Sequence, residues 1–138
     1  AIERRAYSFP WTRGNFIDAL AAGYAAEMLL DADQALIGYF VAMPGVDELH
    51  LLNLTVDPDW QGRGYSHLLL DAVEARCLQR RASMLWLEVR ANNQRARRLY
   101  IRRGFTEVGL RRNYYPAGPG RSEDAVVMSM NVTSRDLD

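Results

Sequence analysis

Lysine is absent from this 138-residue sequence and cysteine occurs once, and each scarcity excludes a kind of chemistry. The phosphate-binding P-loop of nucleotide hydrolases needs a lysine, so nucleotide hydrolysis by that motif is excluded. Cys77 has no second cysteine for an internal disulfide. The longest apolar run, residues 35–43, is far shorter than the ~20 residues that cross a bilayer, and the first five residues lack the apolar core of a secretion signal. We therefore expect a protein of the reducing cytoplasm without a membrane span.

Charge is balanced overall but divided along the chain. The 17 basic residues, all arginine, equal the 17 acidic residues in number. The net charge is −6 over residues 1–60, +9 over 61–121 and −3 over 122–138. This division predicts separate regions that attract anions and cations, unless the charged faces only keep the protein in solution.

Length and hydropathy pattern predict one α/β (α+β) domain over residues 1–132, with a frayed tail at 133–138. A chain of this size buries roughly two-thirds of its unfolded surface, enough for one core. Strands and helices alternate in the second half, which favours a right-handed crossover and a mixed central sheet flanked by helices. The expected elements are a helix ending at Gly23, strands at 25–30, 35–43 and 48–56, a helix at 64–81, a strand at 84–89, a helix at 94–103, and strands at 105–110 and 125–132.

A glycine-containing turn lies between the expected strand that ends at Val56 and the helix that follows. Its sequence is Gln61-Gly62-Arg63-Gly64-Tyr65-Ser66. Small residues let backbone N–H groups surround an anion at the positive end of a helix, so a phosphate would fit there. A tight turn between a strand and a helix needs glycines in any case, and the spaced glycines of the dinucleotide fingerprint are not matched.

Glu88 interrupts the otherwise apolar strand Met84–Val89. A buried carboxylate without a partner costs several kcal/mol. Two explanations stay open: a structural ion pair with Arg90 or Arg111, or a carboxyl group suited to abstract a proton.

Other polar side chains allow both a structural and a functional interpretation. Tyr100 lies on the apolar face of its expected helix, where a tyrosine is usually part of the core. Asn93 precedes that helix and is a candidate cap. Cys77 is expected in the core, and His50 and His67, which lack metal-binding spacing, are expected to be surface or packing residues.

Four segments resemble the GNAT family of acetyl-CoA-dependent N-acetyltransferases. They are the turn 61–66, the segment Leu85–Asn93, and two short motifs, Phe9-Pro10-Trp11 and Arg111–Pro116. The resemblance extends over residues 2–132 and is closest to the branch that acetylates the N-terminal alanine of a ribosomal protein. Ser66 departs from the family pattern, in which a smaller residue is usual. Relatives also begin with a strand before the first helix, and we expect that strand to be absent here.

The resemblance implies how acetyl-CoA is bound. The backbone of Gln61, Gly62, Arg63, Gly64, Tyr65 and Ser66 would hold the pyrophosphate, and Asn93 would contact the coenzyme. Leu54, Thr55 and Val56 would pair with the pantetheine arm like an added strand. In the family this strand splays from the one corresponding to Met84–Val89, which admits the thioester. No metal is implied.

The resemblance also implies the catalytic residues and the acceptor. Glu88 would be the general base and Tyr100 the acid that protonates the departing thiolate, with direct attack by the amine and no covalent enzyme intermediate. The N–H of Val56 would polarise the carbonyl. The acceptor would be the N-terminal alanine of the eighteenth small-subunit ribosomal protein, held by Phe9, Pro10, Trp11, Tyr114 and Tyr115. For the aromatic residues the alternative is a patch that closes the core.

Two other functions remain open from the sequence. One is a GNAT enzyme that acetylates other protein N-termini, lysine or a small amine. The other is an RNA- or ribosome-binding module without turnover, based on a cluster of arginines. We expect no direct nucleic-acid binding and no membrane partner. We expect the protein to be a monomer or a weak dimer. The arginines in question are Arg95, Arg97, Arg98, Arg102, Arg103, Arg111 and Arg112.

Overall fold

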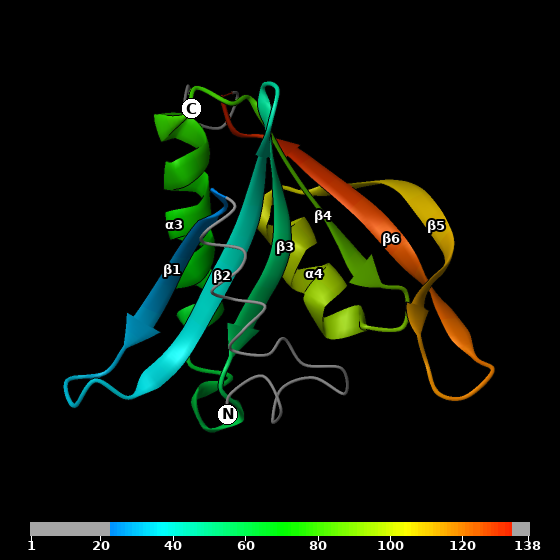
Figure 1. The fold of residues 1–138 in the computed structure, drawn as a ribbon, viewed down its shortest axis with the longest axis horizontal. Coiled ribbons are helices and arrows are strands. Elements are labelled where there is room, and N and C mark those ends of the chain that lie inside the picture. Colours follow the sequence, from blue (N-terminus) through cyan, green and yellow to red (C-terminus); the bar gives the residue numbers. More distant parts are fainter. Residues whose placement is uncertain (1–22, 134–138) are drawn as a thin grey trace.

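A computed structural model describes residues 23–133 and shows one six-stranded mixed sheet (Figure 1). The helix expected before Gly23 and the tail beyond residue 133 lie outside the described residues. The spatial order of the strands is β1-β2-β3-β4-β6-β5. The elements are β1 (Ala25–Leu30), β2 (Leu36–Gly45), β3 (Glu48–Val56), the short 3-10 helix η1 (Pro58–Trp60), α3 (Tyr65–Gln79), β4 (Met84–Arg90), α4 (Gln94–Arg103), β5 (Thr106–Pro116) and β6 (Ser122–Asn131).

The expected mixed sheet is confirmed by the strand pairing. Strands β3 and β4 are parallel and are connected through α3, whereas β1 with β2, β2 with β3, β4 with β6, and β5 with β6 are antiparallel. A parallel pair needs a crossover of this kind because its strands run in the same direction.

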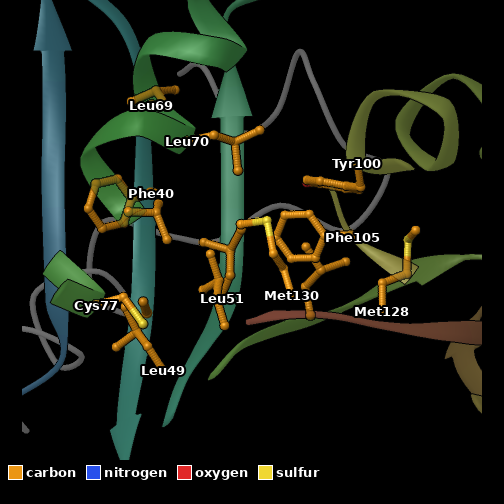
Figure 2. Close-up of a cluster of buried hydrophobic side chains, with 14 of the residues drawn as sticks. Phe40, Leu49, Leu51, Leu69, Leu70, Cys77, Tyr100, Phe105, Met128 and Met130 are labelled. Atoms are coloured by element: carbon orange, nitrogen blue, oxygen red, sulfur yellow. The ribbon is translucent and has the colours of Figure 1, made fainter. Parts of the chain in front are cut away.

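Both helices cover the same face of the sheet. Leu70 and Val73 of α3 and Tyr100 of α4 belong to one buried cluster with Leu85 and Leu87 of β4. Figure 2 shows side chains of this cluster converging from the two helices and from the sheet. Because side chains alternate along a strand, Trp86 and Glu88 lie on the opposite face of β4.

The last hairpin is longer than expected. Strands were expected at 105–110 and 125–132, but β5 continues to Pro116 and β6 begins at Ser122. Almost all of β5 is exposed, so its pattern lacks the buried apolar alternation that identifies a strand. Phe105, expected to start this strand, instead lies buried just before it. The 3-10 helix η1 was also not expected.

Strands β3 and β4 separate halfway along their length. Their parallel pairing ends at Leu51 and Leu87, while β3 continues to Val56 and β4 to Arg90. Figure 1 shows the two strands close together at the top of the view and apart below. The register of β2 with β3 shifts at the same level, where Val41 pairs with Asn53 but Ala42 pairs with Leu51. This bulge bends β3 and ends its pairing with β4, which confirms the expected splay.

Arg103 joins the C-terminal end of α4 to α3. Its Nη2 atom donates to Asp71 at 2.8 Å and to Glu74, and its side chain is only 9% exposed. Glu74 is also largely buried, at 14% exposed, whereas Asp71 is 62% exposed. The ion pair with Glu74 therefore carries most of the interaction between the two helices.

We predict that Arg103→Met lowers the free energy of unfolding by about 2 kcal/mol, because it leaves the Glu74 carboxylate buried without its partner. Urea denaturation followed by circular dichroism measures the change. The exposed neighbouring residue provides a matched control, and Arg102→Met should change stability by less than about 0.5 kcal/mol. Equal losses in both variants would contradict the role of the ion pair.

Candidate active site

The separation of β3 from β4 leaves one edge of β3 directed toward the opening. The backbone N–H of Asp57 donates to the carbonyl oxygen of Ile37 in β2 at 2.8 Å. Because successive residues of a strand direct their backbone groups to opposite edges, the N–H and C=O of Val56 point away from β2. The side chain of Gln61 reaches this edge and donates to the Val56 carbonyl at 3.0 Å.

The glycine turn follows directly from this edge and ends at the start of α3. Gly62 and Gly64 have φ values of 77° and 83°, in the left-handed region that favours glycine. Gly64 occupies the N-cap position without a side-chain hydrogen bond, and the first turn of α3 has no acidic residue. A helix that starts without a side-chain cap presents backbone N–H donors and a positive dipole end, which together suit an anion.

Cationic side chains lie near the turn. Arg63 stacks over the Trp60 ring at 5.2 Å, and Trp60 contacts Tyr65 edge to face at 5.7 Å. The Nη2 atom of Arg95, in the first turn of α4, lies 4.0 Å from where a Cβ atom on Gly62 would be. The turn is therefore flanked by two guanidinium groups that add to its attraction for an anion.

Asn93 and Tyr100 lie where the sequence predicted, at the start and on the buried face of α4. Asn93 is the N-cap, and its side-chain oxygen accepts from the N–H of Ala96 at 3.1 Å, which confirms the expected cap. Tyr100 is 9% exposed and contacts Phe105 edge to face at 5.4 Å. Figure 2 shows the Tyr100 ring directed from α4 toward β3. The phenol thus belongs to the core on the helical face of the sheet.

Glu88 lies on the opposite face, one residue beyond the last parallel pair. Its side chain is 6% exposed. The Oε2 atom is 3.1 Å from Nε of Arg111, so one of the two expected arginine partners is confirmed. The other arginine, Arg90, pairs instead with Glu123 at 3.1 Å.

His50 holds the other oxygen of the same carboxylate. Its Nε2 atom is 2.5 Å from Oε1 of Glu88. Both histidines were expected to be surface or packing residues: His50 is a packing residue at 7% exposed, and His67 lies at the surface. The alternation of β3 could have placed His50 on the face opposite Leu49 and Leu51, but not beside Glu88, which is 38 residues away.

Aromatic rings surround this pair. His50 stacks on Trp86 with ring centres 3.6 Å apart and planes 7° apart, and the Arg111 guanidinium lies 5.5 Å from the centre of the Tyr114 ring. Burial and a hydrogen bond to the Glu88 carboxylate raise the pKa of Tyr114, so its hydroxyl remains a donor at neutral pH. Tyr115 packs under Arg90 at 4.5 Å. The candidate acceptor residues Phe9, Pro10 and Trp11 lie outside the described residues.

Cys77 is a core residue, as expected. It is fully buried, and desolvation together with the charges of Asp47 and Glu74 raises the pKa of its thiol to about 11. A thiol with this pKa is protonated at neutral pH and is a poor nucleophile.

Two other features bear on the chemistry of the described part of the chain. Residues 23–133 contain no group of three or more His, Cys, Asp or Glu side chains arranged to hold a metal ion. Within the same range, no helix has the length and apolar character that a membrane crossing requires.

The arginine cluster does not form one free basic surface. Arg97 pairs with Glu107, Arg103 with Asp71 and Glu74, and Arg111 with Glu88. Ion pairing therefore uses three of the seven arginines considered for RNA binding, which weakens that alternative.

Comparison with known proteins identifies relatives along nearly the whole chain. The family model described as the acetyltransferase (GNAT) family matches residues 1–105. A protein of Salmonella typhimurium named [ribosomal protein bS18]-alanine N-acetyltransferase is 39% identical over 132 residues, which cover 96% of this chain and 88% of the relative. A Haemophilus ducreyi protein of the same name is 37% identical over 129 residues, which cover 94% of this chain and 88% of that relative.

A solved structure is similar in fold and in sequence. The crystal structure of the ribosomal-protein-S18-alanine N-acetyltransferase from Escherichia coli superposes with a TM-score of 0.85 at 37% identity, covering 95% of this chain and 83% of that one. The chain therefore shares the fold of that structure.

Proposed function

Because the chain belongs to the acetyltransferase (GNAT) family and is an acetyl-CoA-dependent N-acetyltransferase, we propose that its acceptor is the N-terminal alanine of ribosomal protein bS18. Three relatives that bear this activity in their names are 37–39% identical over at least 94% of the chain. The proposed place of action is the cytoplasm, where such an acceptor is made, and the proposed form is a monomer or weak dimer without direct contact to nucleic acid.

Proton energetics favour a terminal amine as the acceptor. A terminal amine has a pKa near 8, against about 10.4 for lysine, so deprotonation at neutral pH is easier by roughly 3 kcal/mol. One carboxylate base is sufficient for the terminal amine.

The coenzyme would bind along the open edge of β3 and across the glycine turn. Backbone N–H groups of Gln61 to Ser66 would hold its pyrophosphate, and the segment Leu54-Thr55-Val56 would lie beside the pantetheine arm, with Asn93 near its thiol end. Acetyl-CoA supplies an activated acyl group. The absence of acids from the first turn of α3 and the nearby guanidinium groups of Arg63 and Arg95 support this assignment.

Glu88 and Tyr100 would divide the proton transfers. Glu88 would accept the proton of the attacking amine, directly or through water, and Tyr100 would protonate the departing thiolate. Proton transfer from a phenol with pKa near 10 to a thiolate whose conjugate acid has pKa near 8.5 is slightly uphill, and the phenolate that remains would take a proton from solvent. The N–H of Val56 would stabilise the oxyanion.

One observation carries the proposal: Glu88 and Tyr100 lie on opposite faces of the sheet where β3 and β4 have separated. An amine that approached from one face and a thioester that approached from the other would meet in that opening. Tyr114 and Tyr115, with Phe9, Pro10 and Trp11, would line the path of the peptide.

We expect the protein to add one acetyl group to a basic peptide that begins with alanine. Intact-mass analysis after incubation with acetyl-CoA measures the product. A lysine peptide and a polyamine are the alternative acceptors, and a peptide with a blocked N-terminus is the negative control. Preferential acetylation of lysine or the polyamine would overturn the proposed acceptor.

Glu88→Gln should lower turnover by about 100-fold at pH 7, and less at pH 9, where the amine is largely neutral. An unchanged turnover would remove Glu88 from the mechanism.

Tyr100→Phe should lower turnover by about 10-fold or more, because the thiolate then leaves without a positioned acid. The affinity for acetyl-CoA, measured by isothermal titration calorimetry, should change by less than about twofold, since the ring still packs against Phe105. An unchanged turnover would remove Tyr100 from the mechanism.

Gly64→Ala should weaken acetyl-CoA binding by about 10-fold, because a Cβ atom in the turn crowds the space assigned to the pyrophosphate and disfavours the φ of 83°. Gly23→Ala is the matched control: its φ is 86° and its added Cβ, like that of Gly64, meets no atom within 4 Å. The control should have a similar cost in stability and no effect on binding. Similar binding by both variants would contradict the pyrophosphate site.

A further inference from the structure

The buried contact between His50 and Glu88 is not explained by packing alone. The side chains are 9% and 6% exposed, and the two atoms that meet, Nε2 and Oε1, are 2.5 Å apart. An apolar residue could fill the same space on β3, but it could not satisfy a buried carboxylate oxygen.

The position of His50 along β3 relates the contact to the opening. His50 is opposite Trp86 in the parallel register, one pair before the pairing ends at Leu51 and Leu87. Glu88 follows directly, where β3 no longer covers β4. His50 is therefore held by the paired part of the sheet and reaches toward a side chain in the unpaired part.

The His50 ring has a fixed orientation. It stacks on Trp86 at 3.6 Å with planes 7° apart, and the Arg111 guanidinium lies 5.9 Å from the centre of the Trp86 ring. The stack fixes the plane of the imidazole, and the contact between Nε2 and Oε1 determines which edge of the ring faces Glu88.

The chemistry of the pair determines which group donates. An ionised carboxylate only accepts hydrogen bonds, so a neutral imidazole bonded to it carries its proton on Nε2. Its Nδ1 atom is then an acceptor, and it is buried without a hydrogen-bond partner among the described residues.

The donors around Glu88 leave limited freedom to the carboxylate. His50 hydrogen-bonds to Oε1, and Arg111 forms an ion pair with Oε2, its Nε atom lying 3.1 Å away. A carboxylate offers about four lone-pair sites. The two contacts, one on each oxygen, restrict the orientation of the carboxylate and leave lone-pair sites for the proton of an incoming amine.

We propose that His50 is a positioning residue for the acetyl transfer: its Nε2–H holds the Glu88 carboxylate at the opening in an orientation that leaves lone pairs available to the acceptor amine. This inference rests on the role of Glu88 in the proposed function.

The test compares two amides at position 50. In His50→Gln the amide nitrogen takes the approximate place of Nε2 and can donate to Glu88, whereas in His50→Asn it takes the approximate place of Nδ1 and is too short to reach. We expect kcat within about threefold of wild type for His50→Gln and about 30-fold lower for His50→Asn, part of the roughly 10²–10⁴-fold that a positioned base contributes. The KM for acetyl-CoA should change by less than about twofold in both. Equal kcat values for the two variants would overturn the proposal.

A double-mutant comparison separates this inference from the proposed base. In a Glu88→Gln background, His50→Asn should cause no further loss, because the carboxylate that it positions is absent. If Glu88→Gln alone leaves turnover unchanged, the proposed base is wrong. If Glu88→Gln is impaired and His50→Asn is not, only the positioning role is wrong.

A measurement on the wild-type protein does not depend on the folding of any variant. The nitrogen chemical shifts of the His50 ring, observed by NMR near neutral pH, should show a protonated Nε2 and an unprotonated Nδ1. A ring protonated on Nδ1 alone would overturn the proposal, because Nε2 could not then donate to Glu88.

Discussion

The end of the parallel pairing between β3 and β4 is the constraint on which the site depends. Had the register continued past Leu51 and Leu87, the edge of β3 would be occupied by β4, and the opening in which we propose that coenzyme and amine meet would not exist. The bulge opposite Val41 and Ala42 turns β3 away, while β4 keeps its hydrogen bonds to β6 along its whole length. The sheet is thus opened from one side without losing the strand that carries Glu88.

Local features of the site could be predicted from the sequence because their interactions are local. The glycine turn, the cap at Asn93 and the burial of Cys77 and Tyr100 depend on residues a few positions apart or on one helix face. The partners of Glu88 were harder to predict. Arg111 was one of two candidates, and His50 was missed, because both contacts depend on how strands far apart in the sequence come together.

The two explanations considered for Glu88 describe the same group rather than excluding each other. A carboxylate this deeply buried requires polar partners to remain in the fold, and Arg111 and His50 supply them. The same donors fix its orientation. The exposed strand β5, whose polar sequence concealed its length, contributes Arg111, so the part of the fold that was predicted least well completes the site.

Helix α4 is fastened at both ends, at Asn93 by its cap and at Arg103 by α3. Tyr100 lies within the last turn of α4, before Arg103. The glycine turn leads directly into α3, the helix with which Arg103 forms its ion pairs. The ion pair and the cap therefore connect the helix that carries the phenol to the helix that follows the glycine turn. Under the proposed function, a thioester would find its binding groups already arranged, and little conformational entropy would be lost in assembling them.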